Sequence, residues 1–341
     1  MTSSVALWGQ ETKLTSDQAF AEVEFLARPI NPRPVPAGGT KSRAEFVEDQ
    51  QRQSAGFLYA SEKAREFHTK NPTHEKAAEA KHIEAVSLLR AVQTGSVTQE
   101  PKALRLGHEF RADSTNASAA RFQVASTMTQ IKVSKKQIRD RDALMAEYEQ
   151  SAFDLYGEFP NEPQVFEMML GVARNSKPEK ARALVERIHR MPAPAEVKAQ
   201  AADIVARLDM PGKSLPLEWQ DENGDSRTLA EYKGRPVVFY VWGTGATGSE
   251  SALAEFAKSG RSDVEIVSVN IDRNVEQAKT AKRDGLQGKS SYFDERGLDG
   301  PLAKQLKVAR VPAVHVVDAS GVYIGVGAPS ELESLLAQAK R

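Results

Sequence analysis

A glycine-rich loop follows the most apolar segment of the sequence and is the first candidate for chemistry. Gly243, Gly245 and Gly248 come directly after Val237–Trp242, in the spacing G-x-G-x-x-G. Glycines at this spacing let a pyrophosphate approach backbone N–H groups at the start of a helix. Asp272 ends the next apolar run, where an acid would bind the ribose of a dinucleotide. However, only about 105 residues remain from Val237 onward, too few for a six-stranded Rossmann sheet.

Other reactive side chains are sparse. The 341 residues include no cysteine, which excludes disulfides, zinc–thiolate sites, iron–sulfur clusters and cysteine nucleophiles. Among six histidines, His74 and His82 are spaced to share a helix face, but a metal site needs a third ligand. No Ser–His–Asp or paired-carboxylate spacing is present. We therefore expect no metal and no cofactor.

The charge balance excludes two classes of partner. Lys plus Arg and Asp plus Glu each total 46, and neither half of the chain has the basic excess that nucleic acid or an anionic membrane attracts. Val237–Trp242, the longest apolar run, is far shorter than the ~20 residues that span a bilayer. Met1–Gln10 lack the basic leader and apolar core of a complete signal peptide, so they are either the remnant of a processed one or a plain N-terminal end.

The N-terminal part of the sequence predicts an extended arm followed by an all-α domain. Residues 29–39 contain four prolines and two glycines, which disfavour helix and central strand, so residues 1–40 are predicted to form an arm or linker. From 41 to 210 apolar residues recur at helical spacing, with short Pro-containing joints between the helices. This pattern favours antiparallel helix pairs.

Two helix ends within this domain resemble each other. Arg65–Pro72 and Phe153–Pro160 both combine an aromatic side chain with a closing proline, and the amphipathic helices Lys76–Val92 and Gln164–Arg174 follow them. The pairs loosely resemble the helix–turn–helix units of tetratricopeptide-type arrays, although the period of about 34 residues is absent. An irregular helical bundle is the alternative.

At Pro211 the apolar pattern changes from helical spacing to short strands. Asn223-Gly224 is a strong hairpin turn signal between two such strands. The order after the hairpin is the β-α-β-α-β-β-α order of a thioredoxin-like layer. The predicted elements are a strand at Val237–Trp242, a helix near Glu250–Lys258, a strand at Val264–Ile271, a helix near Val275–Asp284, a short helix at Leu302–Leu306, strands at Ala313–Val317 and Val322–Val326, and a helix from Glu331 onward.

Residues 211–341 resemble the TlpA-type thioredoxins, a group of thiol–disulfide oxidoreductases and redoxins with bacterial extracytoplasmic members. The resemblance is carried by Gly212–Leu217, by the strand Val237–Trp242 with its closing Trp, by Tyr292–Leu306, and by Val311-Pro312 before Ala313–Asp318. It implies a thioredoxin-like fold, a cis peptide bond at Val311-Pro312, and a periplasmic location if a signal peptide has been removed.

The sequence departs from this family at the active site. Where the family has Cys-x-x-Cys at a helix start, this chain has Ala246, Thr247, Gly248 and Ser249. Ala246 stands in place of the attacking cysteine and Ser249 in place of the resolving one. Thiol exchange needs a thiolate of depressed pKa, which neither alanine nor serine supplies. The chain by itself cannot perform dithiol chemistry.

We therefore predict an α/β thioredoxin-like C-terminal domain at 211–341 joined to the helical domain at 41–210. The first functional hypothesis is a redox-inactive module that binds polypeptides in a groove formed by Trp242, Gly245, Val311 and Pro312, as the resemblance implies for the residue before the cis-proline. The second is a thiol–disulfide oxidoreductase or peroxidase-type redoxin whose cysteines have been replaced. The third is nucleotide binding at the glycine-rich loop.

Overall fold

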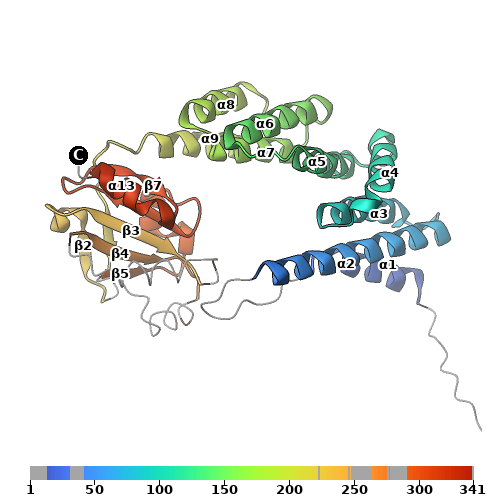
Figure 1. The fold of residues 1–341 in the computed structure, drawn as a ribbon, viewed down its shortest axis with the longest axis horizontal. Coiled ribbons are helices and arrows are strands. Elements are labelled where there is room, and N and C mark those ends of the chain that lie inside the picture. The colour runs from blue at the N-terminus through green and yellow to red at the C-terminus, as the bar shows by residue number, and fades with distance from the viewer. Residues whose placement is uncertain are drawn as a thin grey trace, which may run out of the picture. The chain divides into compact units, whose positions relative to one another are not determined.

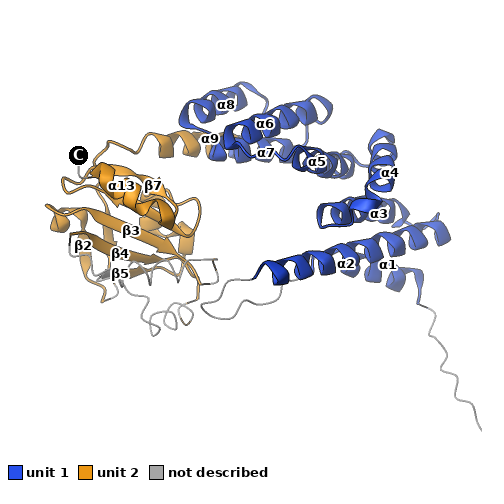
Figure 2. Ribbon diagram, viewed as in Figure 1, with its two compact units in different colours: residues 1–35, 41–197 blue, residues 36–40, 198–341 orange. Residues whose placement is uncertain are grey.

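The computed structural model describes residues 14–30, 42–221, 223–244, 246, 263–274, 276 and 290–339. The chain divides into two compact units, one formed by the described residues up to 197 and the other by those from 198 onward (Figures 1 and 2). The division falls within a helix. The first unit is helical and the second is built on a sheet, as the change of pattern along the sequence predicts.

Capping side chains and prolines define where the helices of the first unit begin. Thr15 and Ser42 form capping boxes with Gln18 and Glu45, and Asp140 caps its helix by accepting a hydrogen bond from the Ala143 amide (2.8 Å). The helices are α1 (Ser16–Leu26), α2 (Arg43–Lys70), α3 (Ala77–Gln93), α4 (Glu100–Ala112), α5 (Ser118–Lys135), α6 (Arg141–Glu158), α7 (Pro163–Asn175), α8 (Pro178–Arg190) and α9 (Ala195–Leu208), with a 3₁₀ turn η1 (Val97–Gln99) before α4.

Helices α1 to α8 pack consecutively, each against the next along the chain. Phe20 of α1 lies against Phe67 of α2, with ring centroids 5.3 Å apart. Leu89 of α3 and Val124 of α5 belong to a second buried cluster that α4 completes. None of the described helices combines the length and the apolar character that a bilayer span requires.

The two similar helix ends adopt the same conformation. Asn71, which caps α2, has φ −126° and ψ 58°, and Phe159, which caps α6, has φ −125° and ψ 59°. Each cap amide donates a hydrogen bond to the carbonyl oxygen four residues earlier, that of Phe67 or Leu155. Each cap also precedes a proline, which disfavours helical geometry for the residue before it. The sequence similarity therefore corresponds to a repeated local structure.

The second unit contains a two-stranded hairpin and a five-stranded sheet. The sheet has the order β5-β4-β3-β6-β7; β3, β4 and β5 are parallel, while β6 and β7 are antiparallel to their neighbours. The elements are β1 (Glu218–Gln220), β2 (Ser226–Thr228), η2 (Leu229–Tyr232), β3 (Val237–Trp242), β4 (Glu265–Asn270), β5 (Ser290–Phe293), η3 (Gly297–Asp299), α12 (Pro301–Gln305), β6 (Ala313–Val317), β7 (Tyr323–Gly327), η4 (Pro329–Glu331) and α13 (Leu332–Ala339).

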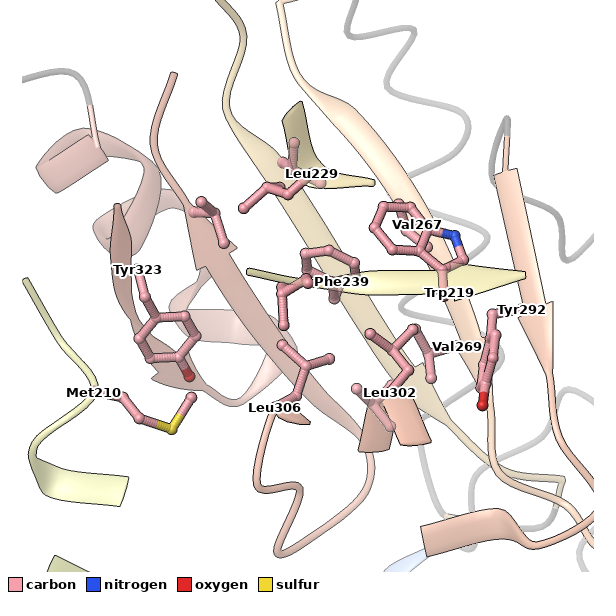
Figure 3. Close-up of a cluster of buried hydrophobic side chains, with 14 residues drawn as sticks. Met210, Trp219, Leu229, Phe239, Val267, Val269, Tyr292, Leu302, Leu306 and Tyr323 are labelled. Atoms are coloured by element: carbon pink, nitrogen blue, oxygen red, sulfur yellow. The ribbon is translucent and has the colours of Figure 1, made fainter. Parts of the chain in front are cut away.

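Strand β3 is buried on both faces of the sheet. Val237, Phe239 and Val241 belong to a core shared with the hairpin and α12, which Figure 3 shows around Trp219 and Leu302. The alternate residues of β3 face the other side, where Leu332 and Leu336 of α13 cover them. A continuous apolar run is the sequence pattern of such a doubly covered strand.

Most of the predicted strands and helices of this unit are confirmed, with one omission. Strands β3 and β6 have the predicted bounds, and β4, β7, α12 and α13 lie within one or two residues of them. The omitted strand is β5: Tyr292–Leu306 entered the sequence analysis only through its family resemblance, and no strand was predicted there, but Ser290–Phe293 pairs in parallel with β4. Four residues that include two serines carry too little pattern to reveal a strand. The helix predicted near 250–258 lies outside the described residues, and so does the one near 275–284 apart from Glu276.

The segment that leads into the sheet is part of this unit's core. Met210 is 6% exposed and packs beside Tyr323 and Leu306 in the cluster drawn in Figure 3. The Gly212 amide donates to the Tyr323 carbonyl oxygen (2.8 Å), and the Tyr323 amide donates to that of Lys213 (2.9 Å). Residues 212–214 thus cover part of the outer edge of β7.

A buried histidine lies on β6, between β3 and β7. Val314 and Val316 of β6 face α13, and His315 points to the opposite side, as their alternation predicts. His315 is 2% exposed; its Nδ1 shares a hydrogen bond of 2.8 Å with the hydroxyl of Tyr323, and its Nε2 has no partner within the described residues. Burial lowers the pKa of His315 to about 3 because the charged imidazolium would be desolvated.

We predict that His315 makes the fold sensitive to acid. Its pKa is about 6.5 in an unfolded chain and about 3 in the folded one, so the unfolded state binds the additional proton as the pH falls between these values. From pH 6.5 to pH 5, stability should fall by about 2 kcal/mol through this residue alone. Urea unfolding of the natural chain and of His315→Gln measures the difference; equal pH slopes for the two proteins would contradict it.

Candidate functional site

One end of the sheet gathers the sequence-predicted site residues that the structure describes. Trp242, the last residue of β3, pairs with Asn270, the last residue of β4, which in turn pairs with Phe293 at the end of β5. On the other side of β3, Val241 pairs with Ala313, the first residue of β6. Pro312 therefore lies next to the end of β3. The carboxyl ends of parallel strands are where open α/β sheets usually bind ligands.

Asp272 connects the loop after β3 to the loop after β4. Its carboxylate accepts hydrogen bonds from the Thr244 amide (2.9 and 3.1 Å), the Thr244 hydroxyl (2.6 Å) and the Asn270 side-chain amide (2.9 Å). The Asp272 amide donates to Oδ1 of Asn270 (3.0 Å). Charge-assisted bonds of this kind are stronger than neutral ones. The carboxylate singled out as a ribose ligand is thus occupied by partners within the chain.

Gly243 permits this contact. A Cβ atom at position 243 would lie 3.3 Å from Oδ1 of Asp272 and 3.5 Å from the Ile271 side chain. Close packing against Asp272 and Ile271 therefore explains why the first position of the G-x-G-x-x-G pattern is a glycine. The sequence analysis did not identify Thr244 and Asn270 as site residues. The spacing Asn270-x-Asp272 at the end of a strand could have indicated Asn270.

The loop after β5 packs against the same region. Gly297 has φ +58°, and a Cβ there would lie 2.7 Å from the Ile271 carbonyl oxygen, so a larger residue would displace the loop. The guanidinium of Arg296 donates to both carboxylate oxygens of Asp294 and lowers the pKa of that carboxyl to about 2. These two acids, Asp272 and Asp294, are both held in place by internal donors.

Trp242 anchors the end of β3 in the core. Its side chain is 3% exposed, it packs in the cluster that α13 covers, and its Nε1 donates to the Ser268 hydroxyl (2.8 Å). The indole therefore fixes the position of the loop that begins at Gly243 and offers almost no surface of its own to a ligand.

Val311 and Pro312 lie before β6 and are half-buried. Their peptide bond is cis, as the family resemblance implied. Within the described residues, the Val311 N–H and C=O have no hydrogen-bond partner, because the pairing of β6 with β3 stops at Ala313. The Val311 side chain packs against the core cluster. An anchored side chain with an unpaired backbone is suited to binding another backbone.

The replaced dithiol positions are described only in part. The Ala246 amide donates to the Gly243 carbonyl oxygen (3.2 Å), which forms a tight turn directly after β3. Gly245, Thr247, Gly248 and Ser249 lie outside the described residues. Among the side chains that the structure describes, no group of three or more acids or histidines could hold a metal ion. The described part of this site offers hydrogen-bonding groups, among them the hydroxyl of Thr244 and the carboxylate of Asp272.

The strand order, the parallel β3-β4-β5 set, the closing β6-β7 hairpin with α13, and the cis-proline beside the end of β3 define a thioredoxin-like α/β unit. The whole chain combines this unit with an all-α N-terminal unit. A search of protein-family profiles finds no match, and neither does a search of curated proteins.

Solved structures similar to this chain are thioredoxin-type domains. The thioredoxin domain of a thiol-disulfide oxidoreductase from Bacteroides vulgatus is 18% identical, with 38% of this chain and 96% of that one covered and a TM-score of 0.33. A thiol-disulfide oxidoreductase from Bacteroides fragilis is 20% identical over 37% of this chain and 98% of that one, with a TM-score of 0.32. The fold assignment rests on the strand order and directions, not on these scores.

We predict that Asp272 holds the loop after β3 in place. Replacing Asp272 with Ala removes three hydrogen bonds to a carboxylate at a partly exposed site, which should cost about 1–2 kcal/mol. Amide hydrogen exchange at Thr244 should also become faster. The matched control is Asp299→Ala, whose carboxylate is paired among the described residues with exposed Arg273 (3.2 Å), so its loss should change stability by less than about 0.5 kcal/mol. Unchanged exchange at Thr244 would refute this role.

Proposed function

We propose that this protein is a redox-inactive, thioredoxin-fold module that binds polypeptides at the end of its sheet. The observation that carries the proposal is the unpaired backbone of Val311, beside the carboxyl end of β3. Its N–H and C=O match the hydrogen bonds that an extended chain offers in strand addition. The neighbouring Pro312 has no N–H, so Val311 supplies the last donor before β6.

The arrangement around Val311 supports binding because it is rigid. The Val311 side chain is packed against the core, and Thr244, at the start of the loop after β3, is hydrogen-bonded to Asp272 in the loop after β4. A site held in one geometry loses less entropy when a flexible chain binds. The polypeptide would be recognised mainly through its backbone, which favours extended segments of varied sequence.

Two further hypotheses have weaker support. An oxidoreductase or redoxin would need thiols, and the chain has none. Nucleotide binding would need the Asp272 carboxylate, which the Thr244 and Asn270 donors already occupy. Binding of a polypeptide at Val311 needs neither a thiol nor a free Asp272 carboxylate, and for that reason we favour it.

We predict that an unfolded polypeptide binds through Val311. The probe is fluorescein-labelled lactalbumin with its cysteines reduced and carboxymethylated, and the measurement is fluorescence anisotropy. Val311→Pro, which removes the N–H donor, should weaken binding at least ten-fold, since a lost backbone bond in a desolvated site costs more than about 1.4 kcal/mol. Val311→Ala keeps the backbone and is the matched control.

A second measurement makes this test independent of any folding defect in Val311→Pro. In the natural chain the Val311 amide should shift in a ¹⁵N spectrum and exchange more slowly when the probe is added. Binding of the probe that leaves the Val311 amide unchanged would place the polypeptide elsewhere and overturn the proposed site.

We also predict that the natural chain does not catalyse disulfide reduction. With dithiothreitol as electron donor, insulin should be reduced no faster than in buffer, because no side chain of the protein forms a thiolate. An Ala246→Cys/Ser249→Cys variant serves as the comparison. If it reduces insulin, the natural chain lacks only the thiols; if it does not, the geometry of the loop also differs. Turnover by the natural chain, free of contaminating thioredoxin, would overturn the non-catalytic assignment.

A further inference from the structure

Helix α1 packs on a surface formed by α2 and α3, and it lies alongside α2 in Figure 1. Its buried Phe20 contacts Phe67 of α2, with the two ring centroids 5.3 Å apart. The Ser16 hydroxyl donates a hydrogen bond to Oδ1 of Asn71, the residue that caps α2 (3.0 Å). An isolated helix of 11 residues is at best marginally stable in water. Helix α1 therefore depends on the surface on which it docks.

The residues after α1 are held by a glutamine and a glycine of α2. The Ile30 amide donates to Oε1 of Gln53 (3.1 Å), and Nε2 of Gln53 donates to the Ile30 carbonyl oxygen. A Cβ atom at Gly56 would lie 2.8 Å from Cδ1 of Ile30, so the glycine leaves room for this side chain. A side-chain amide supplies both a donor and an acceptor, which match the two backbone groups of one residue. Residues 16–30 are thus anchored on α2 at both ends.

The surface that receives α1 is built without it. Ser54, Ser61 and His68 are spaced seven residues apart on α2, and all three bind α3. The Ser54 hydroxyl donates to the Ala91 carbonyl oxygen (2.9 Å) and the Ser61 hydroxyl to that of Glu84 (3.1 Å), while Nε2 of His68 shares a hydrogen bond of 2.6 Å with the Glu84 carboxylate. Because α2 and α3 are joined by their own contacts, their surface does not depend on which copy of the chain supplies α1.

The connection between Ile30 and α2 is longer than docking within one chain requires. Ile30 lies beside Gly56, about 20 Å along the helix axis from the start of α2 at Arg43. Residues 31–41 can span up to about 40 Å. Two copies of the chain present identical surfaces, so α1 finds the same contacts on a second copy as on its own α2 and α3.

Exposed apolar side chains lie on the elements at both ends of this connection. Phe25, in the last turn of α1, is 68% exposed, and Phe46 and Val47, near the start of α2, are 58% and 44% exposed. If α1 is exchanged, the two connections run between the copies, and the elements that they join meet there. Phe25, Phe46 and Val47 are then the apolar side chains that the second copy covers.

We propose that two copies of this chain associate by exchanging α1, so that residues 16–30 of each copy dock on α2 and α3 of the other. The partner is a second copy of the chain, which supplies Phe20 to the site at Phe67 and Ile30 to the site at Gln53. The interface belongs to the helical unit and does not depend on the function proposed for the sheet. Its population rises with protein concentration.

The absence of cysteine from the chain permits a direct test by disulfide formation. Full-length Ser16→Cys and Asn71→Cys single variants are mixed in urea, refolded by dilution and oxidised. Exchange brings the two introduced thiols together in different chains. The mixed disulfide should therefore exceed each of the two homodimeric disulfides at least five-fold. A statistical mixture of the three products would overturn the proposal.

Two pairs of further substitutions, made in both single-cysteine chains, test the contacts. Gln53→Ala should lower the yield of mixed disulfide at least three-fold. The matched control is Gln305→Ala, which removes the same kind of amide contact, to the Glu218 backbone (3.2 and 3.3 Å), from the other unit. Phe46→Ser should also lower the yield, whereas Val97→Ser, at a similarly exposed apolar residue of η1, should not. Equal yields within either pair would contradict the proposed contacts.

A shortened connection tests docking on a second copy independently. Deleting residues 33–40 leaves three residues between Ile30 and Ser42, which reach about 14 Å and cannot span the distance of about 20 Å that docking within one chain requires. Helix α1 of this variant can dock only on a second copy. Light scattering should therefore give twice the mass of one chain, and the α1 amides should remain protected from hydrogen exchange. A monomeric variant would refute the exchange.

Discussion

The burial of β3 on both faces is the constraint on which the second unit depends. Its six residues are all buried, and its two edges pair with β4 and β6. A strand in this position has one register with each neighbour, because a shift by one residue would exchange its two apolar faces. That register determines which residues meet at the end of the sheet: Asn270 beside Trp242, and Pro312 beside the first residues of the glycine-rich loop.

Asp272 gives this end of the sheet its rigidity. In thiol–disulfide oxidoreductases the loop after the first core strand has to present a reactive thiolate, whereas in this chain Thr244 is bonded to a carboxylate on the next loop. Gly243 leaves the space that this contact needs. The first residues of this loop are therefore held by hydrogen bonds to the Asp272 carboxylate.

The helical unit is organised differently, by contacts between neighbours along the chain. Each helix from α1 to α8 packs on the next, and the α2 and α6 ends share one cap geometry before a proline. Contacts between more distant parts of this unit are also present: Ile30, after α1, lies against Gly56 of α2 and is hydrogen-bonded to Gln53.

The sequence by itself determined the two-part organisation, the continuous apolar strand Val237–Trp242 and the cis-proline position. Each of these follows from local pattern: apolar spacing, turn residues, or a motif read residue by residue.

The sequence did not reveal β5, because Ser290–Phe293 is recognisable as a strand only from its pairing with β4. It suggested a ribose ligand at Asp272, and only the tertiary structure decided that Thr244 and Asn270, 28 and two residues away, occupy that carboxylate. The sequence analysis predicted that Trp242 forms part of a polypeptide-binding groove. In the structure its indole is buried, because it packs against α13. The Thr244–Asp272 contact joins two loops that are distant in the sequence and meet because β3 and β4 pair in one register, which no local spacing encodes. The Asn270–Asp272 contact is local, and its spacing was visible in the sequence.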